Sequence, residues 1–104
     1  MSEPAVFAPA ALTDLLEAVA WIAKDNPLAA ETLRDVAATA ARRLGRHPHL
    51  GAIRPLLGAD RYRFFRLRGY PYLLVYTADT SPPRILSVLH MARDLPKIIA
   101  DISP

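Results

Sequence analysis

Cysteine is absent from this chain of 104 residues, and glycine and tryptophan are scarce, with four glycines and one tryptophan. Without cysteine, the chain can form neither disulfides nor thiolate metal sites, which fits a reducing compartment. No stretch approaches the roughly 18 consecutive apolar residues of a membrane span, and the N-terminal residues lack a basic segment followed by an apolar run. We therefore expect a soluble, cytoplasmic protein that is not exported.

Positive charge is concentrated in one part of the sequence. The net charge is +3, but residues 1–40 sum to −4 and residues 41–104 to +7, and between Arg42 and Arg68 there are eight arginines and one acid. Arginine favours planar, bidentate contacts to carboxylate or phosphate groups. This segment therefore predicts a surface for an acidic partner, either a nucleic acid or an acidic protein segment, with a solvated basic face that binds nothing as the alternative.

The N-terminal half predicts a strand and then a first helix. Residues 5–8, centred on Val6 and Phe7, are typical of a short strand that Pro9 ends. Trp21 lies on the flank of the apolar face that follows, and we interpret it as a packing residue. The spacing of that apolar face is helical, and its members are Leu12, Leu15, Leu16, Val19, Ile22 and Ala23.

A second helix should follow directly and form a hairpin with the first. Asn26 is suited to cap it, Pro27 to occupy its first position, and Gly45 to terminate it after Leu44. Its inner face is mostly alanine, which lets a neighbouring element come close. The members of that face are Leu33, Val36, Ala37, Ala40 and Leu44.

Residues 46–60 form a linker. His47 and His49 are possible metal ligands, but no third ligand lies near them and two exposed loop histidines are the commoner arrangement, so we expect neither a metal nor another cofactor. The apolar residues of the linker should pack on the core and leave Arg54 outside. They are Leu50, Ile53, Leu56 and Leu57.

The C-terminal half predicts three antiparallel strands. Residues 61–68 alternate, with a change of phase at Phe64–Phe65 that predicts a bulge or a strand passing from covered to open sheet. After a turn at Gly69, residues 70–77 carry apolar residues of both parities, as in a central strand covered on both faces. Residues 85–89 form the last strand, and residues 95–102 a tail that docks through Ile98, Ile99 and Ile102.

The last strand ends in His90, Arg93 and Asp94, a position where a fold can present polar groups to a partner. From spacing alone, the alternative is local: His90 caps the strand, and Arg93 and Asp94 form an ion pair. Taken together, the elements predict one α+β domain over residues 1–104. Its order is an N-terminal strand, a two-helix hairpin, a three-stranded antiparallel meander and a short C-terminal tail.

This order resembles the RelE/ParE superfamily of bacterial toxins over nearly the whole chain. The resemblance is carried by five segments in sequence order, and the last of them is similar to the ParE branch, whose members are often called plasmid stabilisation proteins. The segments are residues 7–15, 22–30, 48–54, 72–76 (Tyr-Leu-Leu-Val-Tyr) and 88–94 (Val-Leu-His-Met-Ala-Arg-Asp).

The resemblance implies the toxin of a type II toxin-antitoxin system, neutralised by a ParD-like antitoxin. ParE toxins inhibit DNA gyrase, whereas RelE toxins cut ribosome-bound mRNA with basic residues on the sheet. Here Leu73 stands where RelE toxins carry an arginine, and no tyrosine follows Arg93. We therefore expect a gyrase inhibitor that is not an enzyme, with partner- or target-binding residues Arg54, Arg61, Arg63, Arg66, Arg68, His90 and Arg93.

The alternative is a ribosome-dependent mRNA endoribonuclease. In that case His90 would activate the 2′-hydroxyl, and Arg93 would steady the phosphate together with Arg66 or other arginines of the cluster. In either case, acids of the antitoxin should meet the Arg42–Arg68 segment, and its apolar residues should meet the helical hairpin or an open sheet edge.

Overall fold

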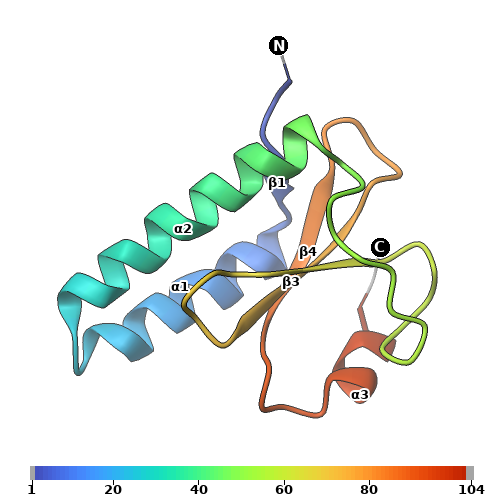
Figure 1. The fold of residues 1–104 in the computed structure, drawn as a ribbon. Helices are drawn as coiled ribbons and strands as arrows, with labels where there is room; N and C mark the ends of the chain where they lie inside the picture. The colour runs from blue at the N-terminus through green and yellow to red at the C-terminus, as the bar shows by residue number, and fades with distance from the viewer. Residues whose placement is uncertain (1, 103–104) are drawn as a thin grey trace.

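The sheet at the centre of the molecule has four strands in the order β1-β4-β3-β2 (Figure 1). β1 runs parallel to β4, whereas β2, β3 and β4 form an antiparallel meander. This computed structural model describes residues 2–102 and confirms the α+β arrangement expected from the sequence. The elements are β1 (Val6–Phe7), α1 (Pro9–Ala23), α2 (Pro27–Arg46), β2 (Arg63–Arg66), β3 (Tyr72–Thr77), β4 (Arg84–His90) and α3 (Leu95–Ala100).

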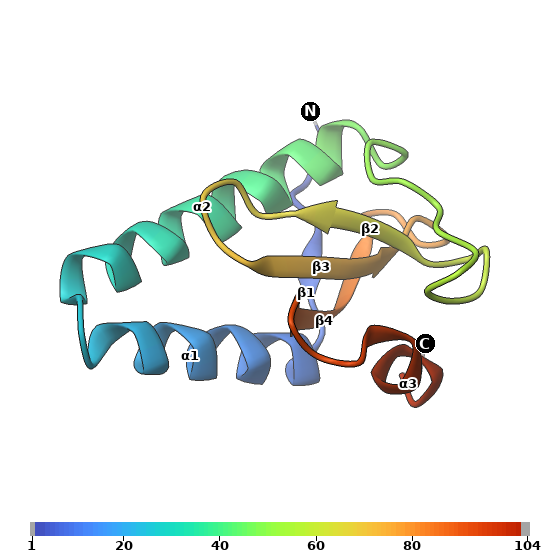
Figure 2. The ribbon, with the colours of Figure 1, turned by 60° about the horizontal axis from the view of Figure 1, so that its bottom comes forward.

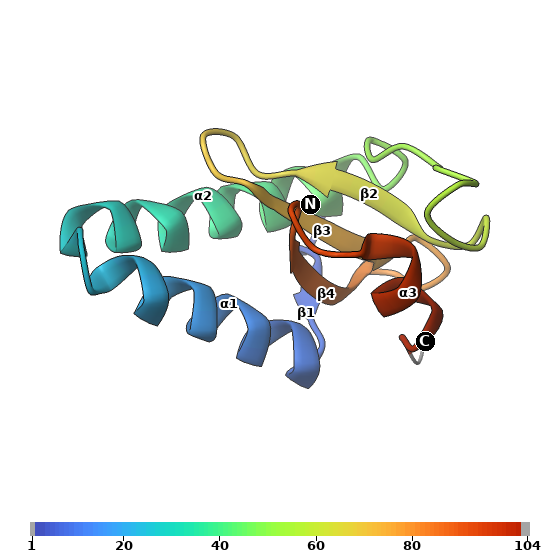
Figure 3. The ribbon, with the colours of Figure 1, turned by 90° about the horizontal axis from the view of Figure 1, so that it is seen from below.

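The helical hairpin covers one face of the sheet, and α3 lies against the other (Figures 2 and 3). β3 is buried along its whole length between these two layers, which confirms a central strand covered on both sides. The tail docks as expected, with Ile99 only 2% exposed and Ile98 and Ile102 packed beside it. No helix within residues 2–102 is long and apolar enough to cross a membrane.

The start of α2 is as predicted, but its end is not. The Asn26 side chain accepts a hydrogen bond from the Ala29 N–H at 3.0 Å, and Pro27 occupies the first helical position. Gly45 does not terminate the helix, which continues to Arg46. Glycine is required there for space, because a Cβ at Gly45 would overlap the carbonyl oxygen of Glu3 as the N-terminal segment passes the helix.

The buried face of α1 is narrower than its apolar pattern predicted. Leu12 and Leu16 are 46% and 45% exposed, and Trp21, interpreted as a packing residue, is 67% exposed. Both of these expectations are wrong, because the buried face of the helix is a narrow row of two alanines, one leucine and one valine, and Leu12, Leu16 and Trp21 lie outside it. The buried members are Ala11, Leu15, Ala18 and Val19.

β2 pairs with β3 without interruption, so the bulge expected at Phe64–Phe65 is absent. The other expected alternative, a strand passing from covered to open sheet, describes the α3 side, where Phe64 is buried and Arg66 is exposed, while Phe65 packs on the hairpin side. The sheet does contain a register shift, but it lies between β3 and β4 at Val75/Tyr76. Gly69 makes the turn between β2 and β3 with a φ of +83°, as expected.

The linker before β2 is held by polar contacts more than by its leucines. Leu57 packs on the core, but Leu50 and Ile53 are 41% and 42% exposed and Leu56 is 92% exposed, which contradicts their expected burial. Arg54 is exposed, as expected. The buried Tyr76 anchors this linker from β3, because its hydroxyl is bonded to two backbone groups of the linker.

Candidate functional site

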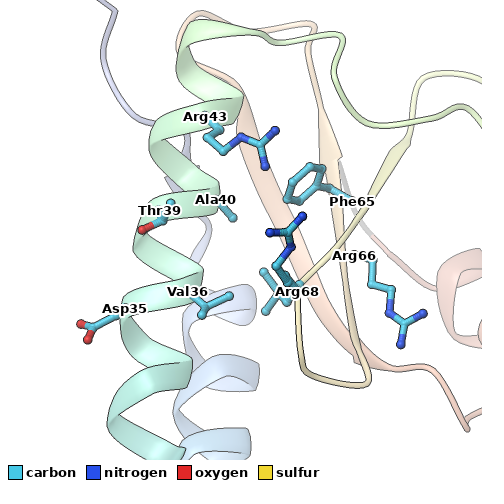
Figure 4. A pocket seen from close by; sticks show the side chains of 9 residues that line it. Asp35, Val36, Thr39, Ala40, Arg43, Phe65, Arg66 and Arg68 are labelled. Atoms are coloured by element: carbon cyan, nitrogen blue, oxygen red, sulfur yellow. The ribbon is translucent and has the colours of Figure 1, made fainter.

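A groove lies between α2 and the C-terminal half of β2 (Figure 4). Its volume is about 670 Å³, and it is partly open to solvent. The helix contributes one wall, and the strand with the turn after it contributes the other. The lining residues are Asp35, Val36, Thr39, Ala40, Arg43, Phe65, Arg66, Leu67 and Arg68.

Positive charge and apolar surface are combined in this groove. The Arg43 guanidinium lies 5.5 Å from the centre of the Phe65 ring, within cation–π range, and Arg68 points toward the same ring (Figure 4). The Arg66 side chain points away from the groove, so its contribution to the wall is mainly backbone. Asp35 is the one carboxylate among the lining residues. We call this feature the α2–β2 groove.

The other arginines of the predicted cluster lie outside the α2–β2 groove. Arg63 is half-buried and donates from Nη1 to the carbonyl oxygens of Gly51, at 2.9 Å, and His49, at 3.3 Å, so it stabilises the linker. Arg61 stacks on the neighbouring Tyr62 ring at 5.2 Å. Arg54 is exposed in the linker. The structure therefore brings Arg68 together with Arg43 in the α2–β2 groove, whereas Arg66 borders it with its side chain turned away.

Tyr76 reinforces the same linker from the core. Its hydroxyl donates to the Pro48 carbonyl oxygen and accepts from the Gly51 N–H, both at 2.8 Å. Burial raises the pKa of the Tyr76 phenol above its usual value of 10.0, although the Gly51 bond and the nearby Arg63 charge both lower it. The phenol is therefore neutral at physiological pH and serves as a fixed donor.

His90 and Arg93 lie at a second, smaller depression of about 260 Å³ between α1 and the end of β4. Trp21 and Glu17 contribute its helical side, and Tyr72 contributes from β3. The His90 ring meets the Tyr72 ring edge to face, with 5.2 Å between centroids. The structure therefore brings His90 and Arg93 together, as the sequence predicted, and surrounds them with aromatic and acidic side chains.

His90 takes part in the turn that ends β4. Its Nδ1 accepts from the Ala92 N–H at 3.1 Å, and its carbonyl oxygen accepts from the Arg93 N–H at 3.1 Å. With Nδ1 as an acceptor, the neutral ring carries its proton on Nε2, an assignment made from the hydrogen bonding. The accepting lone pair is thus engaged with the backbone, and His90 fixes the path of the chain toward α3.

His90 and Arg66 project from opposite faces of the sheet. His90 pairs with Tyr72, which belongs to the core on the hairpin side, whereas Arg66 pairs with Leu73, which belongs to the core on the α3 side. Side chains of directly opposed residues share a face. The two therefore cannot act on one phosphodiester, and the endoribonuclease set of His90, Arg93 and Arg66 is not assembled in this structure.

Asp14 is a polar residue of the β4 edge that sequence reasoning missed. Its Oδ2 accepts from the Val88 N–H at 3.0 Å and from the Ser87 hydroxyl at 2.9 Å. The acid lies on α1, more than 70 residues before its partners, so no local signal identifies it. Arg43 is one of eight arginines in the basic segment, and only the fold distinguishes it from the others by bringing it over Phe65.

A family model described as "ParE toxin of type II toxin-antitoxin system, parDE" matches residues 5–95. A solved structure of the chromosomal ParDE toxin-antitoxin system from P. aeruginosa has a similar fold, with a TM-score of 0.70 and 18% sequence identity. That alignment covers 86% of this chain and 96% of the other. None of the curated protein sequences compared with the chain matches it.

Proposed function

Because the chain belongs to the family of ParE toxins of type II toxin-antitoxin systems, we propose that it inhibits DNA gyrase and that a ParD-like antitoxin neutralises it. The observation that carries this proposal is the family match over residues 5–95, which includes both the α2–β2 groove and the His90–Arg93 depression. The proposed place of action is the bacterial cytoplasm, where gyrase works on DNA.

The arrangement of polar groups favours a toxin that acts by binding. Both faces of the sheet are covered, one by the hairpin and the other by α3, so the basic side chains do not converge on an open sheet surface. The His90 Nδ1 is engaged by the Ala92 N–H, and Arg66 lies on the other face. An endoribonuclease needs a free base close to phosphate-binding cations, and this geometry gives that alternative less support.

A gyrase supercoiling assay tests the proposed activity. The purified toxin, added to gyrase, relaxed plasmid and ATP, should block supercoiling or trap cleaved DNA. The same toxin mixed beforehand with the product of the neighbouring gene should have no effect, which controls for contaminating nucleases. Normal supercoiling at a large molar excess of folded toxin would contradict the gyrase target.

The endoribonuclease alternative needs its own assay. Translating ribosomes are supplied with the toxin, and the mRNA is mapped for new 5′ ends in the A site. We expect intact mRNA. If cutting appears and His90→Ala abolishes it, the toxin is an enzyme and the gyrase proposal falls.

The partner proposal has a separate test. Expression of the toxin together with the small protein encoded beside it should yield a stable complex in which each partner buries roughly 800 Å², the area of a standard interface. Charge pairs across this interface should chiefly speed association, so the association rate should fall as salt rises. Absence of any complex would contradict the neutralising partner.

A further inference from the structure

The helical side of the His90–Arg93 depression is one row of residues along α1. The members of this row are spaced three and four positions apart, so they share one face of the helix: Asp14, Glu17, Ala18 and Trp21. The Asp14 carboxylate is engaged with the β4 backbone, whereas Glu17 is exposed. Trp21, the one tryptophan of the chain, is 67% exposed. An exposed carboxylate and an exposed indole therefore stand one turn apart on this rim of the depression.

The Trp21 indole already contacts a cation of its own chain. The Lys24 ammonium lies 4.9 Å from the centre of the ring, within cation–π range. Lys24 follows Trp21 on the helix, whereas Glu17 precedes it, and Lys24 is not among the residues that line the depression. The side of the ring toward Glu17 is therefore left for a group from another molecule.

The opposite rim of the depression is basic. Arg93 is exposed in the turn after β4, and its N–H donates to the His90 carbonyl oxygen at 3.1 Å. Tyr72 is only 8% exposed and meets the His90 ring edge to face, so these two rings close the depression between its rims. The depression thus has a carboxylate and an indole on one side and a guanidinium on the other.

We propose that this depression is where the toxin binds its target, by receiving an arginine side chain of the target protein against Trp21 and Glu17. A nearby acid of the same target segment pairs with Arg93. The inference rests on the proposed function, which supplies gyrase as the target. A guanidinium fits the helical rim because its flat face stacks on an indole while its N–H groups donate to a carboxylate as a bidentate pair.

Size and charge disfavour other occupants. A volume of about 260 Å³ admits one long side chain, whereas a helix about 10 Å across does not enter it. A strand cannot add at the Val88 N–H, because that group is already bonded to Asp14. A phosphate group would meet the carboxylates of Asp14 and Glu17, which disfavours a nucleic acid. The depression shares no lining residue with the α2–β2 groove, so the two surfaces can be tested separately.

The gyrase supercoiling assay tests the proposal when it is run on paired variants, with affinity for the neighbouring gene product as a second readout. Trp21→Ala and Glu17→Gln should each raise the toxin concentration needed for half inhibition by about tenfold. Affinity for the neighbouring gene product should change by no more than about twofold. Trp21→Phe keeps an aromatic ring for the cation and should lose only about threefold in inhibition.

Matched controls lie on the same hairpin outside the depression. Leu28→Ala removes an apolar side chain that is 72% exposed, and Glu31→Gln neutralises an exposed acid of α2. Each should change the half-inhibiting concentration by less than about twofold, as for ordinary surface substitutions. Losses as large as those of Trp21→Ala and Glu17→Gln would overturn the placement.

An exchange of the two rim charges separates target binding from internal stabilisation. Glu17→Arg combined with Arg93→Glu reverses the polarity of the depression and keeps the net charge of the protein. The exchanged variant, folded by circular dichroism, should inhibit no better than either single variant. Recovery of wild-type inhibition would show that the two charges act on each other and not on the target, which overturns the proposal.

The outcomes distinguish this inference from the proposed function. If the wild type does not inhibit gyrase, both fall together. If the wild type inhibits and Trp21→Ala and Glu17→Gln inhibit equally well, the depression is not the target surface and the proposed function stands. If the variants lose affinity for the neighbouring gene product in the same proportion as inhibition, the depression belongs to that partner and target binding there is excluded.

Discussion

The two edges of the sheet differ in whether their outward-facing backbone groups have hydrogen-bond partners. β1 covers only the start of β4, and beyond it the carboxylate of Asp14 accepts from the Val88 N–H and from the Ser87 hydroxyl. At the other edge, the described residues 2–102 cover β2 through Ala52 beside Phe64, and they leave the backbone of Arg66 open next to the α2–β2 groove. One edge is closed by the chain itself, and the other is open where positive charge gathers.

This difference indicates which surface is available for a partner. Unpaired strand edges promote aggregation, and proteins protect those that serve no purpose. α1 supplies the protection for β4 with a single carboxylate. Among residues 2–102 no side-chain carboxylate bonds to the backbone of Arg66, and the charged residues that line the groove beside it are Arg43 and Arg68 together with Asp35. We therefore regard the β2 edge as the partner surface and the β4 edge as part of the scaffold.

The largest expected effect comes from opening the closed edge. Asp14→Ala removes a charge-assisted bond to the Val88 N–H and another to Ser87, and should lower the free energy of unfolding by about 3 kcal/mol. Urea denaturation measures this loss. Glu17→Ala, an exposed acid one turn along α1, is the control and should change it by less than about 0.5 kcal/mol. Equal effects of the two variants would show that Asp14 does not close this edge.

A smaller loss is expected at the linker that covers part of β2. Tyr76→Phe leaves the Gly51 N–H and the Pro48 carbonyl without their partner and should lower the free energy of unfolding by about 2 kcal/mol. The linker should also become more mobile, which amide exchange at Gly51 and Ala52 would show as faster exchange. Unchanged exchange at both residues would mean that the linker holds its place without Tyr76.

Tyr76 should also make the free energy of unfolding depend on pH. Its pKa is raised in the folded state by burial, so folding favours the neutral phenol. The stabilisation is complete below the unfolded-state pKa of about 10 and is lost as the pH rises through the folded-state value. Stability of the wild type should therefore fall above pH 10 more steeply than that of Tyr76→Phe. Parallel curves for the two proteins would contradict the role of this buried phenol.

The smallest effect is expected at the exposed end of α1. Trp21 is 67% exposed, so Trp21→Ala should change the free energy of unfolding by less than about 1 kcal/mol. Leu15→Ala on the buried face of the same helix should cost about 3 kcal/mol and serves as the comparison. A loss at Trp21 as large as that at Leu15 would show that its ring is part of the core.

Local patterns predicted the fold well. Asn26 followed by Pro27 marked the start of α2, and the double parity of residues 72–77 marked the central strand. Those signals depend on neighbours in sequence. The helical periodicity of α1 could not show which of its apolar residues would be buried. That depends on how closely the helix approaches the sheet, and the alanines of its buried face set this distance. Leu56 was expected to pack but is 92% exposed, because a loop has no periodicity that tells which of its apolar residues face the core.

The candidate site was harder to predict than the fold. Counting charge located the arginine-rich segment but not the face to which each side chain points: Arg63 bonds to the linker, whereas Arg68 points into the α2–β2 groove. The contact between Asp14 and Val88 spans 74 residues. Such pairs are created by tertiary packing, and a single sequence carries no record of them.

The difference between the two edges can be measured directly in the free toxin. Residue-resolved amide exchange compares the N–H of Val88, closed by Asp14, with the N–H of Arg66, open beside the α2–β2 groove. We predict slow exchange at Val88, fast exchange at Arg66, and loss of protection at Val88 but not at Phe64 in Asp14→Ala. Equal protection of Val88 and Arg66 in the monomeric wild type would contradict the assignment of the β2 edge as the open, partner-binding one.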